Sequence, residues 1–155
     1  MIKIEEIPVE RIGEFWDIHI QYLLRDGIIT DPEDEEYFRG DEYRGIIRAH
    51  MERSRDKHHM VYFVEDGARI GAAQYNIYDS EDGKCFVLDF WVFPEFRGNG
   101  TGRRCYGVLE RYTQAAGAKY YELNCEKENA HRFWQSLGFA DCGVDEYDMP
   151  VMVKR

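Results

Sequence analysis

A segment in the middle of the chain combines glycines and arginines directly after an apolar stretch. It follows Pro94 and reads Arg97-Gly98-Asn99-Gly100-Thr101-Gly102-Arg103-Arg104. Glycines let backbone N–H groups turn toward a ligand without obstruction by a Cβ atom. A helix that begins at this point adds unpaired N–H donors and the positive end of its dipole. The combination suits a diphosphate, although a glycine-rich structural turn remains the alternative reading.

Two common phosphate motifs do not fit this segment. A P-loop requires a lysine followed by serine or threonine, and neither pair occurs here. The dinucleotide fingerprint G-x-G-x-x-G is not met, because the three glycines are spaced by two residues throughout.

Asp89 is the only charged residue between Lys84 and Glu95, in an otherwise apolar stretch. A buried carboxylate is unfavourable unless it is paired or used in chemistry. Asp89 is therefore the candidate general base for an acceptor amine. The alternative is that it completes a polar network or faces water.

Two motifs together resemble the Gcn5-related N-acetyltransferase (GNAT) superfamily. Residues 97–102 match its R/Q-x-x-G-x-G/A signature, and Trp91-Val92-Phe93-Pro94 resembles the preceding strand end. Residues 129–139 resemble its A-x-x-F-Y-x-x-x-G-F helix. The similarity is specific over about residues 86–139, and the order of elements agrees over the whole chain.

The resemblance implies an N-acetyltransferase that moves an acetyl group from acetyl-CoA to a primary amine of a small molecule or peptide by direct attack. It implies that backbone pairing with the pantetheine arm comes from the strand end, and that an N–H near Val92 polarises the thioester carbonyl. It further implies contacts of Asn129 and Trp134 with the cosubstrate, Asn124 being the alternative to Asn129. The implied backbone site for the diphosphate comprises Arg97, Gly98, Asn99, Gly100, Thr101, Gly102 and Arg103.

Trp134 departs from the family pattern, which often has a tyrosine at this position near the CoA sulfur. An indole N–H donates a hydrogen bond but cannot deliver a proton. We favour departure of the thiolate without a dedicated acid. The alternative is that Tyr121, Cys125 or Tyr147 replaces the usual tyrosine as general acid. The replacement of tyrosine by Trp134 also keeps open a second function, that of a catalytically weak CoA-binding sensor or interaction module. A third alternative is an acyl donor other than acetyl-CoA.

Residues 26–57 lie where the family varies most, on the acceptor side. The acidic block at 31–42 either attracts a cationic amine or is a solvated face. Five aromatic residues either line a pocket or, at helical spacing, belong to the core; they are Trp16, Tyr22, Tyr37, Phe38 and Tyr43. His58 and His59 cannot both face one metal from a strand, so we expect no metal site. Three further histidines are expected to be packed or at the surface, namely His19, His50 and His131.

Hydrophobic periodicity indicates the elements that position these residues. Strands are expected at 2–7, 60–64, 69–78, 84–93, 119–123 and 147–153, and helices at 8–25, 41–53, 102–116 and 128–137. The three strands from residue 60 onward form an antiparallel meander. This pattern predicts an α+β fold, with one mixed sheet flanked by helices, as a single domain over 1–155. The resemblance adds that the sheet is mostly antiparallel and that its central strands splay apart.

The 155 residues include 20 Lys and Arg against 30 Asp and Glu, a net charge of −10. This charge argues against nucleic acid or an anionic membrane as the main partner and fits a cationic small molecule. No run approaches the ~18 apolar residues of a membrane span. The four cysteines form no C-x-x-C pair. We expect a cytoplasmic protein with reduced thiols, and a homodimer would be in keeping with the family.

Overall fold

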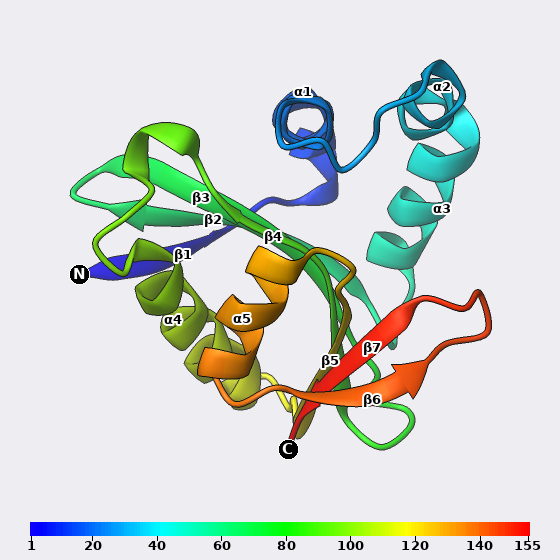
Figure 1. Cartoon of the computed structure of the whole chain (residues 1–155). Helices are drawn as coiled ribbons and strands as arrows, with labels where there is room; N and C mark the ends of the chain where they lie inside the picture. Colours follow the sequence, from blue (N-terminus) through cyan, green and yellow to red (C-terminus); the bar gives the residue numbers. More distant parts are fainter.

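The computed structural model describes all 155 residues, which form a seven-stranded sheet with helices on both faces (Figure 1). The sheet order is β1-β2-β3-β4-β5-β7-β6, and only the β4–β5 pairing is parallel. The strands are β1 (Ile2–Glu6), β2 (His58–Glu65), β3 (Ala68–Ile77), β4 (Lys84–Val92), β5 (Tyr120–Asn124), β6 (Ala140–Val144) and β7 (Pro150–Lys154). The predicted mixed, mostly antiparallel sheet is confirmed.

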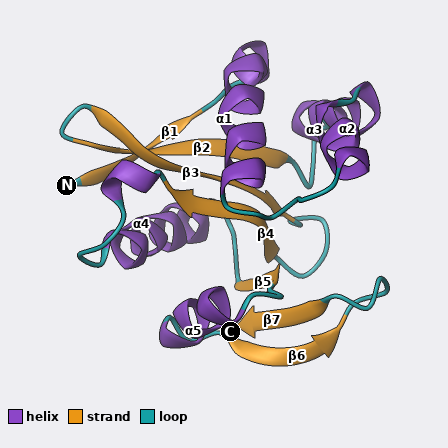
Figure 2. Cartoon of the chain, turned by 45° about the horizontal axis from the view of Figure 1, so that its top comes forward, coloured by secondary structure: helices purple, strands orange, loops and turns teal.

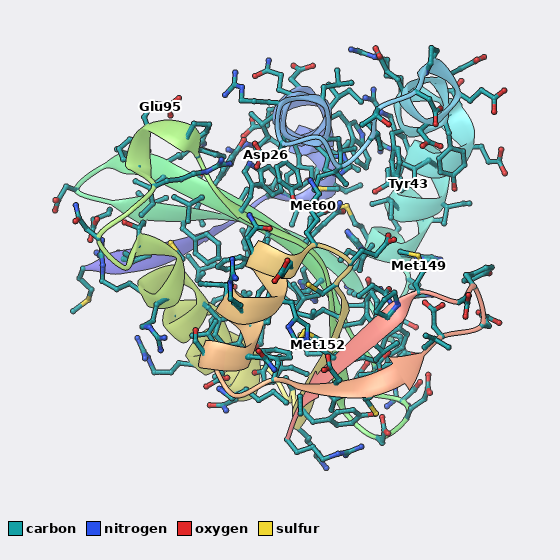
Figure 3. The ribbon with its side chains drawn as sticks, viewed as in Figure 1. Asp26, Tyr43, Met60, Glu95, Met149 and Met152 are labelled. Carbon is teal, nitrogen blue, oxygen red and sulfur yellow. The ribbon has the colours of Figure 1, made fainter.

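The five helices divide between the two faces of the sheet (Figure 2). On one face lie α1 (Ile12–Arg25), α2 (Pro32–Arg39) and α3 (Asp41–Glu52), and on the other lie α4 (Thr101–Ala115) and α5 (Glu128–Ser136). Each face has its own apolar cluster: Met60 belongs to the one under α1, and Met152 to the larger one under α4 and α5 (Figure 3). None of the helices combines the length and the apolar character needed to cross a membrane.

Strands β4 and β5 pair only at their first residues. Lys84–Phe86 align with Tyr120–Glu122, and no pairing follows. β4 continues to Val92 with β3 as its partner on the other side. Beyond Phe86 the edge of β4 that faces β5 is therefore unpaired, which is the splaying that the family resemblance implied.

A bulge in β4 changes which side chains face which helices. The register passes from Tyr75 opposite Val87 to Gln74 opposite Asp89, so Leu88 is an extra residue without a partner. Val87 belongs to the cluster under α4 and α5, whereas Trp91 belongs to the cluster under α1. The bulge thus breaks the strand's regular alternation and turns Asp89 toward α1, on the same face as Trp91.

Two elements were missed by the sequence analysis. The acidic block includes helix α2, whose start was visible in Asp31, which accepts a hydrogen bond from the Asp34 N–H at 2.9 Å, and in Pro32 at the first position. The expected tail strand 147–153 is β7, and the strand that was missed is β6, which pairs with it. All residues of β6 are exposed, so no apolar alternation marks it in the sequence.

Gly71 allows β3 and β4 to approach closely, because a Cβ atom there would lie 2.6 Å from the Trp91 carbonyl oxygen. We expect Gly71→Ala to lower the free energy of unfolding by about 1–3 kcal/mol in chemical denaturation, since backbone must move to make room. Gly45→Ala in α3 is the control, because a Cβ there meets nothing within 4 Å. It should raise stability by about 1 kcal/mol; equal losses in both variants would contradict the packing argument.

Candidate active site

The turn before α4 presents a set of backbone N–H groups without protein partners. Gly98, Asn99 and Gly100 have φ values of 98°, 56° and 73°, so three consecutive residues adopt left-handed conformations. The N–H groups of Thr101 and Arg104 bond within the turn. Five others find no acceptor in the protein, those of Gly98, Asn99, Gly100, Gly102 and Arg103. Free N–H groups at a helix N-terminus are suited to an anion. We call residues 98–103 the anion-binding turn, and their binding of a diphosphate stays a prediction.

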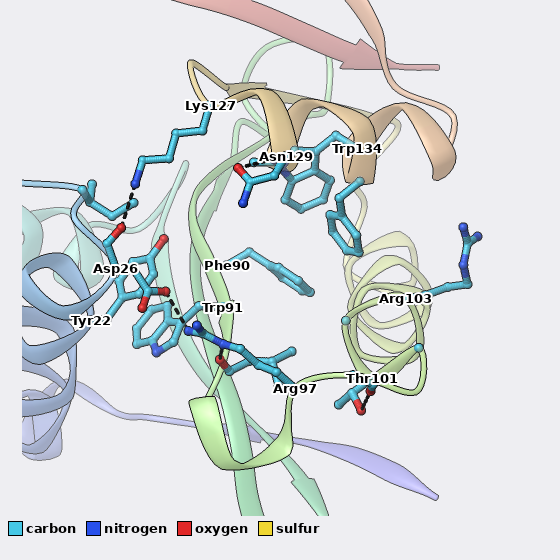
Figure 4. Close-up of a pocket in the computed structure, with 17 residues that line it drawn as sticks. Tyr22, Asp26, Phe90, Trp91, Arg97, Thr101, Arg103, Lys127, Asn129 and Trp134 are labelled. Atoms are coloured by element: carbon cyan, nitrogen blue, oxygen red, sulfur yellow. Dashed lines mark hydrogen bonds and ion pairs between the residues drawn. The ribbon is translucent and has the colours of Figure 1, made fainter.

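A cavity of about 660 Å³ lies between β4, the start of α4 and α5 (Figure 4). Most of the predicted cosubstrate residues line it, namely Trp91, Val92, Arg97, Gly98, Gly100, Thr101, Gly102, Arg103, Asn129 and Trp134. Asn99 and Phe93 do not line it. Gly102 permits close packing between α4 and α5, because a Cβ there would lie 3.2 Å from the Phe133 ring.

The backbone of β4 faces this cavity only at alternate residues. The Phe93 N–H donates to the Ile70 carbonyl at 2.8 Å, so Phe93 faces β3. By the alternation of an antiparallel ladder, Trp91 also faces β3 while Phe90 and Val92 face the opening. The family resemblance implied that Trp91, Val92 and Phe93 would offer their backbone together. The ladder instead leaves Phe90 and Val92 for this role.

Asp26 closes the rim of the cavity from the loop after α1. Its carboxylate pairs with Arg97 at 2.6 Å, and its carbonyl oxygen accepts a hydrogen bond from Lys127 Nζ at 2.7 Å. Arg97 in turn donates to the Val92 carbonyl at 2.8 Å. Three segments distant in sequence therefore meet at one residue, and no motif in the sequence marked Asp26 or Lys127 for this contact.

A second cavity, of about 310 Å³, opens on the other side of the split between β4 and β5. Its walls are mostly apolar, and its polar residues include Asp89 and Glu126. Met149, from the segment between β6 and β7, closes one side (Figure 3). Six residues line both cavities: Tyr22, Ile28, Phe90, Lys127, Ala130 and Trp134. These six residues define the junction where the two cavities meet.

The carboxylate of Asp89 is held through one of its two oxygens. Oδ2 lies 3.0 Å from Nε2 of the buried His19 on α1 and accepts a hydrogen bond from the Gln74 side-chain amide. Oδ1 has no hydrogen-bond partner. Only one side-chain polar atom, Tyr106 Oη, is both fully buried and without a partner, so Oδ1 of Asp89 must be accessible to solvent. Asp89 therefore keeps one oxygen for the cavity that it lines.

The network continues behind Gln74 to a buried histidine. His58 Nε2 lies 2.7 Å from Gln74 Oε1, and His58 Nδ1 lies 2.8 Å from Asn76 Oδ1. Because the Gln74 NH₂ group faces Asp89, its oxygen faces His58 and assigns the His58 proton to Nε2. Nδ1 of the neutral ring is then an acceptor, which requires the Asn76 amide to turn its NH₂ group toward His58. Burial lowers the pKa of His58 to about 4, so the ring is neutral at pH 7.

These contacts show which of the histidines and aromatic residues singled out in the sequence belong to the core and which line a cavity. His19 is packed, as expected, but the sequence did not reveal its contact with Asp89. Tyr43 stacks on His19 with ring centres 6.1 Å apart, whereas Tyr22 lines both cavities. The acidic side chains of α2 line neither cavity.

Of the three residues considered as substitute acids, only Cys125 lines a cavity, and burial raises the pKa of its thiol. Tyr121 Oη is bonded to Thr113 and to the Glu110 carbonyl, and Tyr147 is 78% exposed outside both cavities.

The site thus combines a split between two parallel strands, a turn with free N–H groups and a partly free carboxylate. Residues 20–139 match the model of the acetyltransferase (GNAT) family. The chain belongs to this family, and it is an acetyltransferase.

Solved structures with the same fold cover nearly the whole chain. The PaiA N-acetyltransferase of Thermoplasma acidophilum, crystallised with coenzyme A, aligns with a TM-score of 0.73 at 17% identity over 100% of this chain and 99% of its own. The YycN protein of Bacillus subtilis aligns with a TM-score of 0.74 at 15% identity over 94% and 96%. A metagenomic aminoglycoside acetyltransferase in complex with sisomicin aligns with a TM-score of 0.58 at 13% identity over 87% and 86%. A search among curated proteins gives no significant match.

The anion-binding turn predicts a selective effect of Gly100→Val. Valine disfavours the left-handed conformation at this position and should disturb the free N–H groups. We expect coenzyme A to bind at least ~10-fold more weakly by calorimetry. Gly67→Val is the matched control, because Gly67 also has a positive φ, 80°, but lies in the β2–β3 turn. Both variants should lose stability, and a similar loss of binding in both would refute the assignment.

Buried His58 predicts a dependence of stability on pH. The unfolded chain protonates this ring near pH 6.5, while the folded protein resists protonation down to about pH 4. The free energy of unfolding should therefore fall as the pH drops from 6.5 to 4, with His58 contributing up to about 3 kcal/mol. Denaturation of His58→Gln across this range should show a shallower fall. Parallel curves for the variant and the wild type would contradict a neutral buried ring.

Proposed function

We propose that this protein is an N-acetyltransferase that transfers the acetyl group from acetyl-CoA directly to a primary amine of a small molecule or peptide. Acetyl-CoA is the cosubstrate. The observation that carries the proposal is the meeting of two cavities along the unpaired edge of β4. One leads to the anion-binding turn, and the other contains the free oxygen of Asp89. The continuous sheet, in which the first and last strands take part, supports a single domain over 1–155.

The residues of the larger cavity fit acetyl-CoA. The five free N–H groups of the turn suit its diphosphate, and Phe90 offers its backbone groups to the extended pantetheine arm. The Val92 carbonyl already accepts a hydrogen bond from Arg97, so only the Val92 N–H is free. Acetyl-CoA supplies a thioester, whose carbonyl carbon is attacked by the amine. The Val92 N–H is the donor that we assign to the carbonyl oxygen, because a fixed dipole stabilises the negative charge that develops there. Asn129 and Trp134 complete the wall on the α5 side.

Asp89 is the residue that we assign as general base. At pH 7 a primary amine is mostly protonated, since a lysine-like group has a pKa near ~10.4, and it must lose a proton before it attacks. Oδ1 of Asp89 is free to accept this proton, while His19 and Gln74 hold Oδ2. The same oxygen accepts the second proton of the nitrogen as the amide forms, after passing the first to water.

The acceptor enters through the smaller cavity in this proposal. The carboxylates of Asp89 and Glu126 suit the ammonium group of a small amine, and they outnumber the one cation of the lining, Lys127, which is engaged by the Asp26 carbonyl oxygen. The net charge of −10 supports a cationic acceptor through long-range attraction.

A second candidate function rests on Trp134. Its indole occupies the position of the usual family tyrosine and packs in the core against Phe90, with ring centres 5.3 Å apart. The chain would then be a CoA-binding sensor with weak turnover. Thiol release from acetyl-CoA, measured against a panel of amines, separates the two functions.

Asp89→Asn tests the assignment of the base. The variant keeps the shape of the side chain but removes the proton acceptor, so we expect kcat to fall by about 10²–10⁴-fold. The affinity for coenzyme A should change little, because Asp89 does not line the larger cavity. Asp141→Asn, in exposed β6, should retain wild-type activity. If the wild type binds coenzyme A but releases thiol no faster than Asp89→Asn with any amine, the sensor function is favoured.

A further inference from the structure

The junction between the two cavities contains few groups that can donate a hydrogen bond. The acetyl group must pass from one cavity to the other here, so the sulfur of the leaving thiol lies at the junction. Of the six junction residues, only Tyr22, Lys127 and Trp134 have side-chain donors. These three are therefore the side chains that could stabilise the sulfur as its bond to carbon breaks.

The contacts of the three donors distinguish them. Lys127 Nζ is engaged with the Asp26 carbonyl oxygen at 2.7 Å. Trp134 is held between the rings of Tyr106 and Phe139 on the α5 side, and its indole N–H, like the Tyr22 hydroxyl group, has no protein partner and is not sealed. Tyr22 is the donor on the opposite side, on α1, and its hydroxyl group has no protein partner and is not sealed in the interior.

The ring of Tyr22 is held rigidly, which leaves its hydroxyl group at a defined place. It stacks on Trp91 with ring centres 4.2 Å apart and planes 6° apart (Figure 4). Burial raises the pKa of Tyr22, and the nearby charges of Asp89 and Asp26 raise it further. The hydroxyl therefore stays protonated at neutral pH and remains a donor.

We propose that Tyr22 is a catalytic residue whose Oη–H donates a hydrogen bond to the sulfur of coenzyme A as the thioester breaks. This inference rests on the proposed function. The C–N bond forms, the C–S bond breaks, and sulfur keeps the electron pair as a thiolate. A phenol is a weaker acid than a thiol, so Tyr22 keeps its proton. The thiolate takes one from water on release, while Asp89 accepts the two protons lost by the amine.

Other charges around the junction must be considered in any measurement of the bound thiol. The carboxylates of Asp26, Asp89 and Glu126 disfavour a thiolate, and the cations Arg97 and Lys127 favour it. Arg97 and Lys127 are both engaged by Asp26. Asp89 is the anion that lies closest to the reaction in this proposal, so its charge is removed in the test by Asp89→Asn.

The test measures the pKa of the thiol of bound coenzyme A by the ultraviolet absorbance of its thiolate. In Asp89→Asn, which lacks the nearby charge, we expect this pKa to lie below that of free coenzyme A. Adding Tyr22→Phe, which keeps the ring and its stacking, should raise it by about one unit, a tenfold change in the ionisation constant. An unshifted thiol in Asp89→Asn, or equal values with and without the hydroxyl group, would overturn the role of Tyr22.

Kinetics give a second readout that needs no absorbance signal. In an otherwise wild-type protein, Tyr22→Phe should lower kcat roughly 100-fold with little change in KM for acetyl-CoA. Tyr121→Phe and Tyr147→Phe should keep wild-type kcat, since neither residue lines a cavity. An unchanged kcat in Tyr22→Phe overturns the inference and leaves the proposed function standing. Failure of the wild type to bind coenzyme A would overturn the proposed function itself.

Discussion

Beyond Phe86, strand β4 has a protein strand as partner along only one of its edges, and the proposed site depends on this asymmetry. The ladder to β3 fixes the strand up to Val92, whereas pairing with β5 ends at Phe86. Backbone groups along the free edge need partners, because an unpaired N–H or carbonyl in a buried place is unfavourable. An extended substrate can meet this requirement as an added strand does. The two cavities, the anion-binding turn and Asp89 all border this one opening.

Most of the attraction that this turn offers to an anion comes from the main chain, so the proposed site is compatible with an acidic protein. Three arginines in the turn suggest a cluster of positive side chains, but two of them are neutralised: Arg97 by Asp26 and Arg104 by Glu65, each at 2.6 Å. Arg103 bonds to the neutral Ser136 hydroxyl. The oriented N–H groups and the dipole of α4 remain, and they persist whatever the net charge of the surface.

The buried polar network explains how a carboxylate is tolerated beneath α1. Burying a charged group is unfavourable unless hydrogen bonds satisfy it. Gln74 links Asp89 to His58, and His19 approaches the same carboxylate oxygen from α1. This hydrogen-bond network joins β2, β3, β4 and α1, so the position of the candidate base is set by the elements that form the core on this face.

The sequence by itself determined the order of most elements, the glycine turn before α4 and the isolated Asp89, because these features depend on local spacing and on the properties of single residues. It also held the signals for α2 in Asp31 and Pro32, which the acidic composition obscured. Only the tertiary structure decided that Leu88 forms a bulge, that Asp89 therefore faces His19, and that Tyr22 reaches the junction. Register and contacts across 70 residues depend on how strands pair and helices pack, and no local pattern in the chain encodes them.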